Sequence, residues 1–324
     1  GWGDKNTRVP FPWRLFPDME ARENYTRYIA ARYSAYNVYF IVAGEWHAEI
    51  RTRAGSEDEI REEFIGIGNA LDDADPHNRM IGIHPMTGNG SVREFNKASW
   101  MSFGDYQQNY PLLHKRILES MVFNKPVVNS EYGYHLRDKD GDSVPDKDNS
   151  TSLESMRYAS WDIAMAGGYF ITGFGTTYFG GNRDPGPFNV DAEKNDDWER
   201  QIGYIKSFFE GLEYWKLMSC DSLLTCKVAR GEDDRQLNRL APLSKTYWLL
   251  AEPGRQYVIY VRGIVEKISL KMEEISASRF EVKFFNPRTG EMKIVNDGTD
   301  LKESYTCTVP DNNDWVLLIL KKSD

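Results

Sequence analysis

Residues Asn37–Glu49 are Asn-Val-Tyr-Phe-Ile-Val-Ala-Gly-Glu-Trp-His-Ala-Glu, and the rest of the chain is arranged around them. Their first part, Val38–Ala43, is an unbroken apolar run that is too short for a helix. Because it also lacks the alternation of a half-exposed strand, it predicts a strand buried on both faces, as in parallel sheets. Glu45, Trp46 and His47 follow at the carboxyl end of this strand, where parallel α/β folds carry their chemistry.

A second segment repeats this design. Val127–Ser130 predicts another short buried strand, and Glu131 and Tyr132 follow it directly. Two buried strands that each end in a glutamate and an aromatic residue predict that Glu45 and Glu131 face one cleft.

Helices and strands alternate through the first part of the chain. The predicted helices are Met19–Tyr36, capped by Asp18, then Glu57–Leu71, Pro111–Phe123 and Ser152–Ala166. Besides the two strands above, the predicted strands are Met80–His84, Ser99–Phe103 and Tyr169–Phe174. Such alternation is typical of a (β/α) fold with a parallel sheet.

The pattern changes near Trp198. A predicted helix, Trp198–Trp215, leads into short alternating stretches that are separated by turn signals such as Pro253-Gly254 and Asp297-Gly298. The predicted strands here are Thr246–Leu250, Gln256–Val261, Phe280–Phe285 and Trp315–Leu320. This spacing predicts a small all-β sandwich.

Composition restricts the classes of function. The 324 residues are enough for one large domain and a smaller one. A formal net charge of −9 with no basic cluster argues against nucleic acid or an anionic membrane as a partner. No apolar run reaches the roughly 18 residues of a membrane span. Aromatic residues make up 13% of the chain, which favours a site that stacks on ring-shaped ligands as well as a large core.

The three cysteines, Cys220, Cys226 and Cys307, all lie in the last third of the chain. Their spacing matches no zinc-binding pattern. Two arrangements stay open at this point: one disulfide with one free thiol, or three buried thiols.

The segment Asp138–Asp148 places aspartates at alternate positions, which suits a single hard cation such as Ca²⁺. The candidate ligands are Asp138, Asp140, Asp142, the carbonyl of Val144, and Asp146. Ser143 and Asn149 stand where an EF-hand has Gly and Glu, so the loop departs from that motif. A structural Ca²⁺ beside the active-site rim and a solvated acidic loop are the two interpretations; no cofactor is expected for catalysis.

Motifs along nearly the whole chain resemble, in the right order, the apiosidase-like glycoside hydrolases. They are Ala31–Asn37 leading into Ala43-Gly44-Glu45, His84-Pro85, Tyr106-Gln107, Asn129–Tyr132, the segment from Arg157 to Gly168, Phe285–Glu291 and Asp314–Leu317. This family has (β/α)₈ TIM barrels with the two-glutamate design of the large retaining-glycosidase clan. A C-terminal β-domain labelled "putative collagen-binding" follows the barrel.

The resemblance implies that Glu45 is the general acid/base and Glu131 the nucleophile, as glycosidic cleavage requires one protonated and one ionised carboxyl group. The alternative is that Glu45 and Glu131 are ordinary strand-end glutamates in salt bridges. For the histidines, the alternative to a ligand contact is a structural role. The implied substrate-binding residues are Trp46, His47, His84, Tyr106, Gln107, Tyr132 and Tyr178.

The chain resembles only strands four to eight of such a barrel. Residues 1–197 correspond to the C-terminal part of the barrel, 198–215 to a connecting helix and 216–324 to the β-sandwich. A barrel without three strands would leave two unpaired edges, so we expect a separate N-terminal fragment of the same precursor to supply strands one to three. The start Gly-Trp-Gly-Asp, without initiator methionine or signal peptide, also predicts a piece of a longer precursor.

A further departure is Gly44, because many enzymes of the clan have Asn before the acid/base. The partner of the sugar 2-hydroxyl group must then come from another position. The expected function is a secreted, periplasmic or cell-surface retaining glycoside hydrolase that acts on a plant or microbial polysaccharide. A carbohydrate-binding pseudoenzyme with the same fold and aromatic cleft is the alternative, and an adhesion role of the β-domain is a third.

Overall fold

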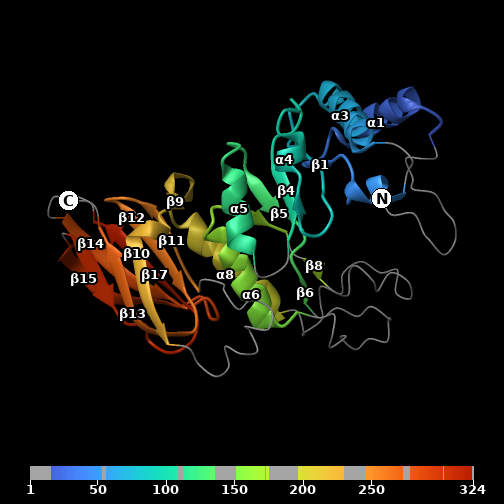
Figure 1. Ribbon diagram of the computed structural model, residues 1–324. Helices are drawn as coiled ribbons and strands as arrows, with labels where there is room; N and C mark the ends of the chain where they lie inside the picture. The colour runs from blue at the N-terminus through green and yellow to red at the C-terminus, as the bar shows by residue number, and fades with distance from the viewer. Residues whose placement is uncertain are drawn as a thin grey trace. The chain divides into compact units, whose positions relative to one another are not determined.

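The computed structural model describes residues 16–52, 56–108, 112–135, 151–171, 173–174, 196–229, 246–272, 278–301 and 303–322 (Figure 1). The chain divides into two compact units. Unit 1 comprises Gly1–Asn109, Arg116–Tyr132 and Tyr169–Ile171, and unit 2 comprises Tyr110–Lys115, Gly133–Gly168 and Thr172–Asp324. Helix α5 (Leu113–Met121) contributes residues to both units.

Unit 1 is built on short parallel strands that pair in the order of the chain. The parallel pairs are β1 (Phe40–Ile41) with β2 (Ile81–Gly82), β4 (Gly104–Gln107) with β5 (Val127–Asn129), and β5 with β7 (Tyr169–Phe170). Strand β3 (Asn89–Gly90) joins β4 in the antiparallel direction. The mixed α/β class predicted from the sequence is confirmed, and closure into an eight-stranded barrel stays a prediction.

Backbone hydrogen bonds extend the pairing of β1 and β2 beyond the two strands. The His84 amide donates to the Ala43 carbonyl at 2.9 Å, and the Trp46 amide donates to the His84 carbonyl at 3.1 Å. Because these bonds continue the register of the strands, they hold Glu45 beside His84.

Helices α1 (Met19–Tyr33) and α3 (Glu57–Ala74) pack side by side in unit 1 (Figure 1). Asp18 caps α1 through its side chain, as the sequence predicts, and Ser56 and Glu59 form a reciprocal capping box at the start of α3. The shorter helices of unit 1 are α2 (His47–Thr52) and α4 (Val92–Phe95).

The predicted strand Ser99–Phe103 is wrong; this run is a loop with buried apolar side chains, and β4 begins after it. The rings in the loop fill space left by glycines. A Cβ on Gly68 would lie 2.2 Å from the Trp100 ring, and one on Gly82 would lie 2.5 Å from Phe103. The apolar run therefore belongs to the core without being part of the sheet.

Strand β1 is also shorter than predicted and is not buried on both faces. Phe40 is buried against the apolar core of unit 1, whereas Ile41, which points to the opposite face, is 37% exposed. In the described part of the chain, only the core side of this strand is therefore covered.

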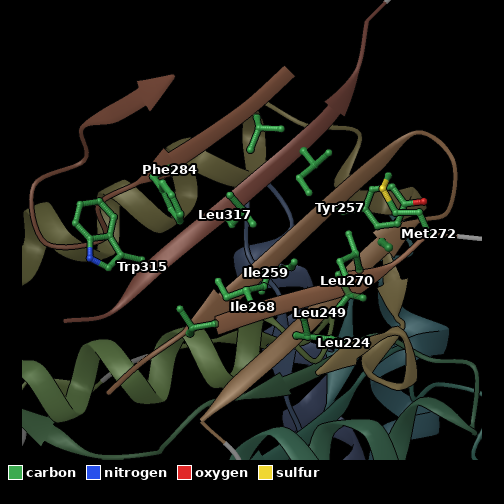
Figure 2. Close-up of a cluster of buried hydrophobic side chains, with 14 of the residues drawn as sticks. Leu224, Leu249, Tyr257, Ile259, Ile268, Leu270, Met272, Phe284, Trp315 and Leu317 are labelled. Atoms are coloured by element: carbon green, nitrogen blue, oxygen red, sulfur yellow. The ribbon is translucent and has the colours of Figure 1, made fainter. Parts of the chain in front are cut away.

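Unit 2 contains a β-sandwich of two antiparallel sheets. The six-stranded sheet has the order β15 (Met292–Leu301), β14 (Ser278–Phe285), β17 (Trp315–Lys321), β12 (Gln256–Val261), β11 (Tyr247–Glu252), β9 (Met218–Ser219), and the three-stranded sheet has the order β10 (Leu224–Ala229), β13 (Ile264–Lys271), β16 (Ser304–Cys307). Figure 2 shows side chains of both sheets in one apolar cluster, among them Ile259 and Leu317 of the larger sheet and Ile268 of the smaller one. The predicted sandwich is confirmed.

Two helices cover the other face of the six-stranded sheet: α6 (Leu153–Ala164) and α8 (Asp196–Glu210). The Trp161 ring on α6 stacks on Tyr260 of β12, with centroids 5.3 Å apart, and contacts Phe208 of α8 at 5.6 Å. Both faces of β12 are therefore buried.

The remaining elements are β6 (Tyr134–His135) parallel to β8 (Gly173–Phe174), and the short 3-10 helices η4 (Tyr214–Lys216) and η5 (Asp221–Leu223). No helix among the described residues is long and apolar enough to cross a membrane.

The three cysteines form no disulfide, and the strand register shows why one of the possible pairs cannot form. Cys226 on β10 and Cys307 on β16 both pair with Ile268 of the strand between them. They are therefore two strand spacings apart, about 10 Å, which is too far for a disulfide. All three cysteines are half-buried thiols. Burial raises the pKa of the Cys307 thiol to about 11, even though a hydrogen bond with Tyr305 acts in the opposite direction.

Candidate active site

Three side chains of unit 1 converge where strands β1, β2 and β5 end. One carboxylate oxygen of Glu45, one ring nitrogen of His84 and one carboxylate oxygen of Glu131 all lie within 4.8 Å of one another. The structure thus brings together the two glutamates that the strand pattern singled out, and it places a histidine with them.

Glu45 is held by an unusual backbone conformation. Its φ of 44° lies in the left-handed region, which a non-glycine residue rarely adopts. The residue is only 9% exposed. Backbone strain of this kind is found mainly at functional sites, where the surrounding structure must hold it. Here the Trp46–His84 backbone hydrogen bond fixes the chain directly after the strained residue.

His84 contacts charged or polar groups through both ring nitrogens. Nδ1 lies 3.1 Å from Oδ2 of Asp105 and 2.9 Å from Oγ of Ser130. Nε2 lies 3.2 Å from Oε2 of Glu131. Because two carboxylates, which accept hydrogen bonds, face the two nitrogens, the geometry favours a ring that is protonated at both positions.

The electrostatics agree with a positively charged His84. Burial lowers the pKa of this imidazole, but the hydrogen bonds and charges of Asp105 and Glu131 outweigh burial and raise the pKa from 6.5 to about 9. The histidine therefore carries a positive charge at neutral pH, next to the Glu131 carboxylate. A cation at this distance stabilises the ionised form of its neighbour.

Asn129, which is fully buried, fixes the strand end that carries Glu131. Its side-chain amide donates to the carbonyl of Gln108 at 2.9 Å. Its side-chain oxygen accepts hydrogen bonds from the amide of Glu131 at 3.3 Å and from that of Gln108 at 3.4 Å. One side chain thereby ties the end of β4 to the segment that carries Glu131.

Two of the predicted substrate-binding aromatic residues lie in the core. Trp46 is fully buried and packs edge-on against Phe95, with ring centroids 5.0 Å apart. Tyr132 is 2% exposed and lies edge-on against Phe170. We therefore do not assign either ring to sugar stacking. His47 is partly exposed; its Nδ1 accepts a hydrogen bond from a backbone amide of the β2–β3 connection.

The other predicted substrate-binding residues differ in accessibility. Tyr106 is partly exposed, and its hydroxyl oxygen accepts a hydrogen bond from Ser120 at 2.7 Å. Gln107 is buried in β4. Tyr178 lies outside the described residues, as does the whole segment Asp138–Asp148, so its Ca²⁺ ligands stay a prediction.

Within the described chain, Glu45, His84 and Glu131 form a group that could hold a metal ion. Two carboxylates and an imidazole are donors that suit Zn²⁺. In the present arrangement, however, the Nε2 proton of His84 occupies the space between the ring and Glu131, so a metal ion would have to displace it. Two neighbouring carboxyl groups, one of them beside a cation, can instead act as a proton donor and a nucleophile.

Comparison with known protein families agrees with the motifs. The "Apiosidase-like, catalytic domain" matches residues 1–216, two thirds of the chain. The chain belongs to the apiosidase-like family. The "Putative collagen-binding domain of a collagenase" matches residues 241–320, within the sandwich. A comparison with curated proteins found no match.

Solved structures show which fold this apiosidase-like chain has. One described as a glycoside hydrolase is 15% identical, with a TM-score of 0.70 over 95% of this chain and 70% of the other. A glycoside hydrolase family 5 structure from Bacteroides vulgatus ATCC 8482 is 14% identical, with a TM-score of 0.69 over 95% of this chain and 67% of the other. At such identities the likeness establishes a glycoside-hydrolase fold.

Sequence reasoning missed two residues of the apiosidase-like site, Asp105 and Ser130, which both contact His84. A usable signal was present for Asp105. It lies within a four-residue strand that is otherwise apolar, small or amide-bearing, and aspartate is disfavoured in strands. Ser130 gave no signal beyond its position directly before Glu131.

Proposed function

We propose that the chain is a retaining glycoside hydrolase that cleaves glycosidic bonds of a plant or microbial polysaccharide or oligosaccharide. The observation that carries the proposal is the approach of Glu45 and Glu131: a carboxylate oxygen of one lies within 4.8 Å of a carboxylate oxygen of the other. Retaining enzymes hold their carboxyl groups about 5–5.5 Å apart, whereas inverting enzymes need about 6.5–9.5 Å to admit a water molecule. The short separation supports the retaining class.

In the first step, a Glu131 oxygen attacks the anomeric carbon as the glycosidic C–O bond breaks. The leaving oxygen takes the proton of the Glu45 carboxyl group, so the aglycone departs as a neutral alcohol. The sugar is then an ester of Glu131, and Glu45 is a carboxylate.

In the second step, Glu45 removes a proton from water, and the water oxygen attacks the anomeric carbon. The ester bond breaks, which restores the Glu131 carboxylate and the protonated Glu45. His84 supports both ends of this cycle, because its positive charge lies next to the oxygen that carries negative charge before and after the ester exists.

The test is turnover of a panel of aryl glycosides and pectic oligosaccharides, including an aryl apioside because of the family name. Glu131→Gln should lower kcat by about 10⁴-fold or more, since an amide keeps the shape but cannot form the ester. Glu45→Gln should reduce hydrolysis least for substrates whose leaving group needs no proton.

The matched control is Glu62→Gln, an exposed glutamate on α3, which should retain full activity. Near-normal turnover by Glu131→Gln would remove the assignment of the nucleophile. Saccharide binding by the wild-type chain with no turnover of any substrate in the panel would instead support the carbohydrate-binding pseudoenzyme.

A further inference from the structure

Asp105 is a fully buried carboxylate with a narrow set of contacts. It lies in β4, has no exposed surface, and directs Oδ2 at His84 Nδ1 over 3.1 Å. Among the described residues its other oxygen, Oδ1, has no hydrogen-bond partner. Its backbone is fixed by Ser91, whose hydroxyl accepts from the Asp105 amide at 2.8 Å and whose amide donates to the Asp105 carbonyl at 2.8 Å.

A buried charge is stable only when it is paired, because removing an ion from water carries a large desolvation penalty. The cation that Asp105 contacts is His84. The position of the carboxylate is therefore explained by what it does to His84. Nδ1–H faces Oδ2 of Asp105 and Oγ of Ser130, and these two contacts set the plane of the ring. Nε2–H is thereby directed at Glu131.

We propose that Asp105 is a positioning residue of this site: it holds the His84 imidazolium so that Nε2–H donates to the catalytic carboxylate of Glu131. The inference deepens the proposed function and rests on it for its catalytic meaning. Asp105 touches neither substrate nor the reacting atoms; it acts through His84.

The device matters most when Glu131 is esterified. The ester carries no charge, so during that part of the cycle His84 loses the anionic neighbour of Nε2, while Glu45, which has given up its proton, becomes a carboxylate nearby. The charged groups that face the ring are Asp105 from β4, Glu131 after β5 and Glu45 after β1. Asp105 takes no part in the reaction, so its contact with Nδ1 persists through the cycle and supports a protonated His84 until Glu131 is released.

Asp105→Asn tests the proposal, since the amide oxygen can still accept from Nδ1–H while the charge is removed. We expect kcat to fall on the order of 100-fold with little change in KM. We also expect the alkaline limb of the pH–activity profile to move to lower pH by at least one unit. The matched control is Asp75→Asn, another buried aspartate of unit 1, which binds Arg79. It should lower stability without moving the pH profile.

A second measurement does not depend on turnover. The chain has five histidines, and the His84 ring signals in an ¹H–¹⁵N spectrum are identified by their loss in His84→Gln. In the wild-type protein both ring nitrogens should stay protonated up to pH of about 9. In Asp105→Asn the proton should be lost at least one pH unit lower.

These readouts separate the two claims. If the histidine titration shifts as expected but no glycoside is hydrolysed, the proposed function fails and the Asp105–His84 coupling stands. If Asp105→Asn loses stability as Asp75→Asn does while the His84 titration and the pH profile stay at wild-type values, Asp105 is merely structural and the inference is overturned. A neutral His84 ring in the wild-type protein at pH 8 overturns it without any variant.

Discussion

Buried charges are arranged differently in the two units. In unit 2, two buried aspartates face arginines: Asp314 accepts two hydrogen bonds from Arg157, at 2.8 and 2.9 Å, with Arg288 lying 3.7 Å away, and Asp162 binds Arg262. In unit 1, a single histidine, His84, contacts two carboxylates and lies near a third.

These two arrangements have different consequences. The ion pairs of unit 2 join Arg157 and Asp162 of α6 to the chain next to β17 and β12, so they hold the helix on the sheet without any change of protonation. Three ionised carboxyl groups would carry more negative charge than one imidazolium can neutralise. The protonation of such a group therefore depends on pH. Substitutions in the ion pairs of unit 2 are therefore expected to lower stability, and substitutions around His84 of unit 1 are expected to alter pH dependence.

The largest predicted effect on stability is that of Asp314→Ala. It leaves the Arg157 guanidinium, whose side chain is 6% exposed, without its main partner, and should destabilise unit 2 by about 3–5 kcal/mol. Urea unfolding measures the change. The control is Asp197→Ala, which breaks an exposed pair with Arg200 on α8 and should cost less than about 1 kcal/mol. Equal effects of the two substitutions would contradict the structural role assigned to the buried pair.

The next effect concerns pH and unit 1. The folded-state pKa of His84, about 9, lies above the ordinary value of 6.5, so protonation of His84 stabilises the folded state. This contribution, up to about 3 kcal/mol, is complete below pH 6.5 and is lost as the pH rises through 9. Urea unfolding at pH 6 and pH 9.5 should show a loss in the wild-type protein that is much smaller in His84→Gln. His77→Gln, at an exposed histidine of unit 1, serves as the control; a loss in His84→Gln as large as in the wild type would refute the prediction.

The smallest effects are those of the helix caps. Ser56→Ala removes the capping box of α3 in unit 1, and Ser152→Ala removes the cap of α6 in unit 2; each should cost about 1 kcal/mol. Amide hydrogen exchange of the first turns should rise only in the helix whose cap is lost. A rise in both helices from one substitution would show that the two units do not respond separately.

The elements that the sequence predicted well have strong local signals. Helices α1 and α3 have polar caps followed by a helical pattern, and β12 and β17 are apolar runs between clear turns. The missed strands have weak signals. Strand β13 is half lysine, glutamate and serine, and β15 runs through Asp297-Gly298, which the sequence marks as a turn. Two register shifts in the facing strand β14 accommodate the long, irregular β15.

The sequence predicted those site residues that directly follow a recognisable strand. Glu45 and Glu131 follow apolar runs, so their position was visible in the chain. The direction of the aromatic side chains was not, because a tryptophan after a strand can face either a cleft or the core, and Trp46 faces the core. Asp105 was missed because the preceding apolar loop, Ser99–Phe103, resembles a strand and hid the start of β4.

The anomeric configuration of the first product shows whether Glu45 and Glu131 act as an acid/base and nucleophile pair. Proton NMR, recorded early in the hydrolysis of whichever glycoside the chain cleaves, shows this configuration before mutarotation sets in. The two-step mechanism predicts a product with the same anomeric configuration as the substrate, formed by the wild-type protein and not by Glu131→Gln. A first product of inverted configuration would contradict the account, since water would then have attacked directly and Glu131 could not have formed the ester.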